Sequence, residues 1–144
     1  MDMVKTASAD FLNSLTHGEI KIEQSIELIK GFLEEKPNDE YSLVIGTDSH
    51  EKTSDKTGKS NSKTINLVTA VLVHRKGFGG KYFWRRKNVS DIHSLREKIY
   101  AETLESLNFA LFYVPMLRKS LNGNSPLYNL EIHIDVGEHG DTSD

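Results

Sequence analysis

Two aspartates of this 144-residue chain follow short runs that have the composition of β-strands. The apolar run Leu43–Gly46 leads into Asp48, and the alternating run Glu131–Ile134 leads into Asp135. An aspartate at the end of a strand is commonly a turn former, and Asp48 taken alone favours that interpretation. The same pattern at two strands favours the alternative, in which rigid elements hold both carboxylates in place for chemistry.

A third carboxylate, Glu102, lies on the face of an expected long helix that should pack against a sheet. At about 100° per residue, Glu102 falls about 20° from the centre of an apolar stripe, whereas Glu97 and Glu105 lie off it. Burying a carboxylate costs free energy unless it is paired, so the position indicates function. Alternatively, Glu102 lies at the edge of the stripe and reaches solvent. The other members of the stripe are Leu95, Ile99, Ser106, Phe109, Ala110, Tyr113 and Leu117.

The three carboxylates together indicate a metal site. If the first and last strands are parallel neighbours, Asp48 and Asp135 lie side by side, and a helix across them can add Glu102. Three carboxylates repel one another in a small site unless a cation is present. Oxygen ligands suit Mg²⁺ or Mn²⁺, and pairs of such ions catalyse the hydrolysis of phosphodiesters.

The elements that must position these acids are expected in the order α, α, β, β, β, α, β. The glycine turn at residues 77–80 joins two strands into an antiparallel hairpin, and Pro115 should end or kink the long helix. A second apolar face of that helix, Leu104, Leu107 and Leu111, is expected to be covered by the N-terminal helices. The expected helices cover 8–15, 19–36 and 92–114, and the expected strands cover 41–47, 64–75, 81–89 and 128–137.

Composition excludes several classes of protein. The absence of cysteine excludes disulfides, thiol catalysis and cysteine-ligated zinc, and suits a reducing compartment. No apolar run approaches the roughly 20 residues that span a bilayer, and the N-terminus lacks the core of a signal peptide. We therefore expect no membrane partner and a cytoplasmic location.

Charge is unevenly distributed along the chain. The segment Lys52–Lys87 holds ten Lys and Arg against the single acid Asp55, although the whole chain carries a net charge of −3. A basic segment of this kind is typical of proteins with a polyanionic partner; the alternative is a solvated lysine-rich loop and hairpin. Trp84 lies beside basic residues, which suits base stacking, although it could equally pack against the helix. The candidate nucleic-acid-binding residues are His74, Arg75, Arg85, Arg86 and Lys87.

The chain resembles the YkuK-like family of the ribonuclease H-like superfamily, a poorly characterised group of bacterial proteins predicted to be nucleases. The resemblance rests on "IGTDSH", "VLVHRKGFGGKYF", "SLREKIYAETLESL" and "EIHIDVGEHGDT". It implies an α/β fold with a ribonuclease H-like core: an antiparallel β-β-β meander, a long helix and a parallel fourth strand. We expect a single domain over 1–144, with a helical N-terminal extension over 1–40 and the core over 41–144.

The superfamily fold continues beyond the fourth strand, so we expect its C-terminal part to be missing from this chain. In the family that region brings a further acidic residue, and Asp141 and Asp144 are the candidates to substitute for it here.

The resemblance implies a metal-dependent nuclease that uses Mg²⁺ or Mn²⁺. Asp48 would bridge two ions, and Glu102 and Asp135 would each hold one of them, with Glu97 as the reserve for the helix acid. The substrate would be a nucleic acid, with RNA, DNA and hybrid all open. One alternative is a catalytically inactive nucleic-acid-binding or protein-interaction module of the same fold. A nucleotide-binding domain of the actin and sugar-kinase type is disfavoured, because 144 residues leave no room for its second domain.

Overall fold

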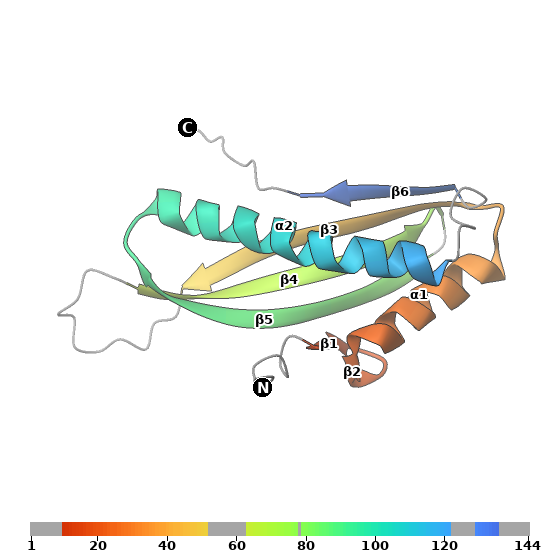
Figure 1. Ribbon diagram of the computed structural model, residues 1–144, viewed down its shortest axis with the longest axis horizontal. Helices are drawn as coiled ribbons and strands as arrows, with labels where there is room; N and C mark the ends of the chain where they lie inside the picture. Colours follow the sequence, from red (N-terminus) through yellow and green to blue (C-terminus); the bar gives the residue numbers. More distant parts are fainter. Residues whose placement is uncertain (1–9, 52–62, 78, 122–128, 136–144) are drawn as a thin grey trace.

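The protein is an α/β fold in which two helices cover one face of a six-stranded mixed sheet (Figure 1). The computed structural model describes residues 10–51, 63–77, 79–121 and 129–135. The strand order across the sheet is β2-β1-β5-β4-β3-β6. The strands are β1 (Phe11–Ser14), β2 (Gly18–Lys21), β3 (Glu40–Glu51), β4 (Lys63–Arg75), β5 (Gly80–Ile92) and β6 (Asn129–Ile134), and the helices are α1 (Ile22–Glu35) and α2 (Leu95–Ser120).

The expected core is confirmed. Strands β3, β4 and β5 form an antiparallel meander, and β6 pairs with β3 in parallel. Because side chains alternate along a strand, the odd-numbered residues of β3 and β4 face the helices, and Tyr41, Leu43 and Val71 among them are buried. The even-numbered residues of β3 and β4 and those of β5 up to Asn88, together with Glu131, His133 and Asp135 beside β3, lie on the opposite side. We call this side the open face, because neither described helix packs on it.

The N-terminal segment differs from the expectation of two helices. The helix expected over 8–15 is wrong: Phe11–Ser14 forms β1 and pairs with β2 in a hairpin. The turn depends on Gly18, whose φ of 70° suits glycine, and on the Ser14 hydroxyl, which accepts N–H bonds from Thr16 and His17 at 3.2 Å. Strand β1 also pairs with β5, so this segment extends the sheet rather than forming a helical extension.

Helix α2 begins and ends later than the sequence predicts. Strand β5 continues to Ile92, and the helix begins at Leu95 after the N-cap Ser94 rather than at residue 92. The Ser94 hydroxyl accepts the N–H of Glu97 at 3.1 Å, and Glu97 in return accepts the N–H of His93 at 2.6 Å. These reciprocal bonds satisfy N–H groups that a helix start leaves unpaired. Pro115 does not end the helix, which continues to Ser120.

The two helices meet at the C-terminal half of α2. The hydroxyls of Ser25 in α1 and Tyr113 in α2 are 2.7 Å apart in the core. Burial raises the pKa of Tyr113, so the phenol stays neutral and the contact is a neutral hydrogen bond. Helix α1 does not cover Leu104, Leu107 and Leu111, which are exposed, contrary to expectation. Neither described helix is long and apolar enough to cross a membrane.

Replacing Gly80 by alanine should destabilise the protein, because the added Cβ would lie 2.3 Å from the carbonyl oxygen of Val73. We expect the free energy of unfolding to fall by about 1–3 kcal/mol, as in other overpacked sites. Urea denaturation measures the change.

The matched control is Gly31→Ala within α1, where nothing lies within 4 Å of the added Cβ. Alanine forms helices better than glycine, so this variant should gain about 0.5–1 kcal/mol. Equal denaturation midpoints for the two variants would contradict the close approach of β4 and β5 beside their turn.

Candidate active site

Asp48 and Asp135 lie on the open face, on neighbouring strands. The parallel register pairs Ile45 with Ile134, and the N–H of Asp135 then donates to the Ile45 carbonyl at 2.8 Å. This register places Asp135 beside Gly46, two residues before Asp48 on the same face. Diagonal neighbours in a sheet are roughly 7–8 Å apart, so the two carboxylates can reach a common ligand.

Gly46 gives the Asp135 side chain room to lie over β3. A Cβ built on Gly46 would be 3.2 Å from the Cβ of Asp135 and 3.5 Å from its Oδ2. The first of these distances is shorter than ordinary van der Waals contact. A side chain at position 46 would therefore push the carboxylate of Asp135 away from β3 and from Asp48.

Asp48 lies within a strand instead of opening a turn. Strand β3 continues to Glu51, and Asp48 pairs with Val68 in an unbroken ladder with β4. Its side chain is exposed, and its Oδ1 accepts the N–H of Ser49 at 2.9 Å. The interpretation of Asp48 as a turn former is wrong, and a rigid element holds this carboxylate.

Glu102 lies on the other side of the sheet. Its side chain is buried, as the apolar stripe indicates, and its Oε2 accepts a hydrogen bond from the Ser49 hydroxyl. One turn later, the Ser106 hydroxyl donates to Thr47 Oγ1 at 2.8 Å, and Thr47 Oγ1 lies 3.0 Å from Thr69 Oγ1. We call the contacts Ser49–Glu102 and Thr47–Ser106 the polar clamp.

The polar clamp separates Glu102 from the two aspartates. Thr47 and Ser49 flank Asp48 and both turn toward α2, so Asp48 must turn away from α2. The structure therefore places Asp48 and Asp135 on one face of neighbouring strands and Glu102 on the other side of the sheet. Among the described residues, no group of three or more His, Asp or Glu side chains is placed to hold a metal ion.

The other two glutamates of α2 have structural partners. Glu105, which the helical projection places off the stripe, is buried and forms ion pairs with Arg85 at 3.4 Å and Lys87 at 3.3 Å. Glu97, the reserve for the helix acid, is exposed and caps the start of α2. Asp141 and Asp144 lie outside the described residues.

The candidate nucleic-acid-binding residues divide between the two faces. Arg75 is buried, with its guanidinium 4.0 Å from the centre of the Phe32 ring and 2.8 Å from the Phe32 carbonyl oxygen, so it is unavailable to phosphate. Arg85 and Lys87 point toward α2, where they pair with Glu105. His74 and Arg86 remain exposed on the open face.

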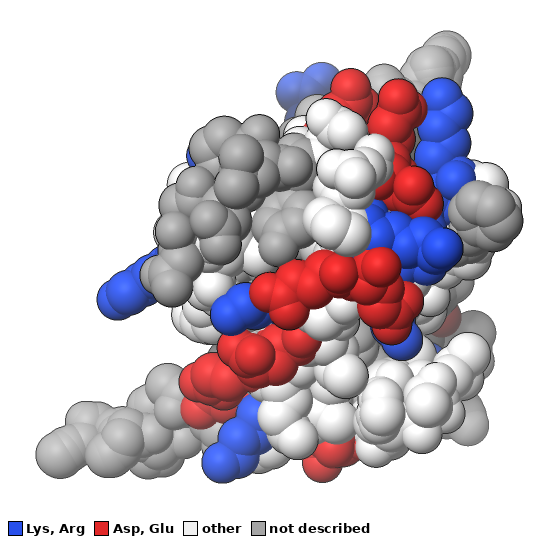
Figure 2. Space-filling model, turned by 90° about the vertical axis from the view of Figure 1, so that its right-hand side faces the viewer, with Lys and Arg blue, Asp and Glu red and all other residues white. Residues whose placement is uncertain are grey.

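Much of the segregated positive charge is paired within the fold. Acidic residues of other elements bind the basic side chains of β4, β5 and their turn, and Figure 2 shows acidic side chains in a band with Lys and Arg beside them at one end of the molecule. The basic segment alone is therefore weak support for a polyanionic partner; its residues Lys52, Lys56 and Lys59 lie outside the described part. The pairs are Lys63–Glu51, Arg75–Glu35, Lys76–Glu40, Arg85–Glu105 and Lys87–Glu105.

Two aromatic residues, Tyr82 and Trp84, form a pair on the open face. The sequence indicates Trp84 as a candidate for base stacking but does not reveal its partner Tyr82. The rings of Tyr82 and Trp84 stack with centres 5.4 Å apart and planes 28° from parallel. Trp84 does not pack against α2, because it alternates with Phe83, which does face the helices. Ala70 of β4 and Gly46 of β3 lie between Trp84 and Asp135 across the sheet. Because both residues are small, no bulky side chain rises from the open face between Trp84 and Asp135.

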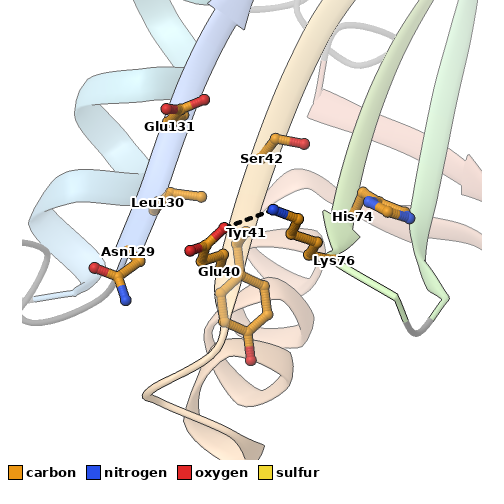
Figure 3. Close-up of a pocket in the computed structure, with 8 residues that line it drawn as sticks. All are labelled: Glu40, Tyr41, Ser42, His74, Lys76, Asn129, Leu130 and Glu131. Atoms are coloured by element: carbon orange, nitrogen blue, oxygen red, sulfur yellow. Dashed lines mark hydrogen bonds and ion pairs between the residues drawn. The ribbon is translucent and has the colours of Figure 1, made fainter.

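A polar pocket of about 680 Å³ occupies the far end of the open face (Figure 3). Ser42 lies between His74 and Glu131 in the register, and Lys76 pairs with Glu40 at 3.2 Å across its mouth. Ser42 is six residues from Asp48, or roughly 20 Å along the strand. The pocket is therefore separate from the two aspartates. Its lining residues are Glu40, Tyr41, Ser42, His74, Lys76, Asn129, Leu130 and Glu131.

Comparison with known proteins places this geometry in a family context. The family described as "Ribonuclease H-like" matches residues 24–144 of the chain. The uncharacterized protein YkuK of Bacillus subtilis (strain 168) is 31% identical over 139 residues, which cover 91% of this chain and 76% of that protein. No solved structure matches the chain.

Ser49→Ala should destabilise the protein, because it leaves the buried Glu102 carboxylate without its partner. We expect a loss of about 1–3 kcal/mol in the free energy of unfolding. The double variant Ser49→Ala/Glu102→Met should recover much of this loss, since no unpaired polar group remains. A double-mutant cycle by urea denaturation measures the coupling, and strictly additive effects would contradict a direct bond between the two side chains.

Proposed function

Because the chain belongs to the ribonuclease H-like family, we propose that it is a divalent-metal-dependent nuclease whose metal-binding residues are Asp48 and Asp135. The observation that carries the proposal is the placement of these two carboxylates on one face of adjacent parallel strands. The space left by Gly46 supports it further, because it lets Asp135 lie toward β3.

The two aspartates fit one ion better than two. Mg²⁺ keeps several water ligands in proteins and commonly binds through one or two carboxylates together with substrate phosphates. Asp48 and Asp135 supply this donor set for Mg²⁺ or Mn²⁺. The described position of Glu102 does not fit a second ion, because its carboxylate lies on the α2 side with Ser49. When bound, a divalent ion would polarise a phosphodiester and make water a better nucleophile at neutral pH.

The chain's own residues would orient the metal ligands. The polar clamp ties Thr47 and Ser49 of β3 to α2 through their side chains. The N–H of Ser49 also donates a hydrogen bond to Oδ1 of Asp48, which restrains that carboxylate. A ligand held in this way loses less conformational entropy when it binds, which favours affinity. In this role Glu102 is a positioning residue that acts through Ser49.

Side chains beside the aspartates support a nucleic acid as the substrate. Tyr82 and Trp84 offer aromatic surface on the open face, where unpaired bases can stack. Arg86 lies in the same row as Asp48, with Val68 between them. Adjacent strands are about 4.8 Å apart, so roughly 10 Å separate β5 from β3. If a base stacks on Tyr82 and Trp84, the phosphates of the neighbouring nucleotides could span the roughly 10 Å between β5 and β3 and reach Asp48.

A second candidate is a nucleic-acid-binding or protein-interaction module of the same fold that does not hydrolyse its partner. The observation that favours it is the engagement of Glu102 with Ser49, which leaves two carboxylates for a metal in place of three. Cleavage assays with and without metal separate the two candidates.

Asp48→Asn and Asp135→Asn should each weaken Mn²⁺ binding by an order of magnitude or more and abolish cleavage. Asparagine keeps the shape of the side chain but removes the charge that the ion requires. Titration calorimetry measures Mn²⁺ affinity, and Mg²⁺-dependent cleavage is assayed on RNA, DNA and hybrid substrates.

Two acids serve as controls for this experiment. Glu131→Gln removes a charge from the same face, four residues before Asp135, and Glu102→Gln removes the buried charge on the α2 side. Both should retain Mn²⁺ affinity, since neither binds the ion and the amide oxygen at position 102 can still accept the hydrogen bond of Ser49 that positions Asp48. Equal cleavage by Asp48→Asn and the unaltered chain would contradict the assignment of the site. Nucleic-acid binding by the unaltered chain without any cleavage would favour the non-hydrolysing binding module.

Trp84→Ala should weaken binding of single-stranded nucleic acid by about 1–3 kcal/mol if a base stacks on it. Arg86→Ala should shallow the dependence of affinity on salt by about 0.7–0.9 log units per log unit of salt, the value for one phosphate contact. Fluorescence anisotropy over a salt series measures both effects. The control Lys119→Ala removes an equal charge at the end of α2; an equal change of slope there would show that the open face is not the binding surface.

A further inference from the structure

The outward side of α2 carries an apolar stripe that no described element covers. It lies opposite the side that packs on the sheet, and it begins at Tyr100 in the second turn of the helix. Helix α1 contacts only the C-terminal half of α2, through Ser25 and Tyr113 and through Glu27 and Ser120 (Figure 1). We call it the outer stripe; its members and exposed fractions are Tyr100 66%, Leu104 44%, Leu107 38% and Leu111 75%.

The spacing of the outer stripe is that of a helix-pairing seam. Its members follow one another at intervals of four, three and four residues, which is the a/d spacing of a heptad repeat. Intervals of four, three and four read the same in both directions. An antiparallel copy of the helix can therefore place Tyr100 opposite Leu111 and Leu104 opposite Leu107, and each contact occurs twice about a two-fold axis.

We propose that two copies of this chain associate through their outer stripes, with the two α2 helices antiparallel. A two-fold interface uses the same surface on both copies, and the symmetric spacing of this stripe meets that requirement without a further partner. The proposal does not depend on the metal site, because the outer stripe and the open face lie on opposite sides of the sheet.

The residues beside the outer stripe suit a close antiparallel contact. Ala101, Thr103 and Asn108 flank it and carry no charge, so like charges do not meet at the centre of the pair. In the same register Arg118 of one copy is about equally far along the helices from Arg96 and from Glu97 of the other, so the charges at the ends neither favour nor oppose the pair.

The size of the outer stripe predicts a weak dimer. It exposes on the order of 400 Å² of apolar surface per copy, similar to the largest apolar patch of an ordinary monomer. Stable interfaces bury about 800 Å² per partner, so the association should depend on concentration in the micromolar range. A shallow hollow of about 440 Å³ beside Tyr100, lined by Ile99 and Thr103 among others, would receive part of the partner's Leu111.

Cysteine cross-linking tests the register, because the chain has no cysteine of its own. We would oxidise Tyr100→Cys and Leu111→Cys separately and as a mixture, and separate the products by intact mass. The antiparallel pairing predicts a disulfide between the two variants and none between identical ones, since identical positions are 11 residues apart, or about 16 Å along the helices. Disulfides between identical positions would indicate a parallel pair and overturn the proposal.

Sedimentation velocity over a concentration series tests the association itself. The unaltered chain should shift from monomer to dimer, and Leu107→Lys should stay monomeric, with circular dichroism confirming that it is folded. The control Leu15→Lys alters a residue that is 86% exposed on the β1–β2 hairpin and should dimerise normally. A monomer at every concentration, or an equal loss of dimer in both variants, would overturn the proposal.

Discussion

The structure depends on the two hydrogen bonds by which α2 holds the backbone on either side of Asp48. Ser106 binds Thr47 and Glu102 binds Ser49, so two alternate residues of β3 are committed to the helix side. Because side chains alternate along a strand, Asp48 between them must project from the open face. The same contacts therefore turn Asp48 toward the open face and hold Glu102 on the other side of the sheet.

Both buried carboxylates of α2 are paired with side chains of the sheet. An unpaired buried carboxylate is costly, and each of the two on this helix has partners: Glu102 has the Ser49 hydroxyl, whereas Glu105 has Arg85 and Lys87. The basic side chains of β5 thus balance the charge at the helix–sheet interface. The carboxylates of Asp48 and Asp135 and the stacked rings of Tyr82 and Trp84 all lie on the open face, away from this interface.

The periodicity of strand runs and helical stripes predicts the core strands, the long helix and the burial of Glu102. The meander and the parallel fourth strand are predicted from the resemblance to the family, because strand pairing depends on contacts between distant segments. The sequence does not reveal the face on which Asp48 lies, since Leu43, Val44 and Ile45 are all apolar and hide the alternation. The first strand is missed because Phe11, Leu12 and Leu15 have helical spacing, whereas Gly18 and the Ser14 hydroxyl impose a turn. Ion pairs between distant segments, such as Arg75–Glu35, cannot be read from the local excess of charge.

The most direct test of this account is the anomalous scattering of Mn²⁺ in a crystal of the chain soaked with that ion. We expect a peak on the open face, within coordinating distance of both Asp48 and Asp135 and separated from Glu102 by the sheet. A peak between Asp48 and Glu102 on the α2 side would contradict the face assignment. The absence of any peak at the aspartates under saturating Mn²⁺ would contradict the metal site itself.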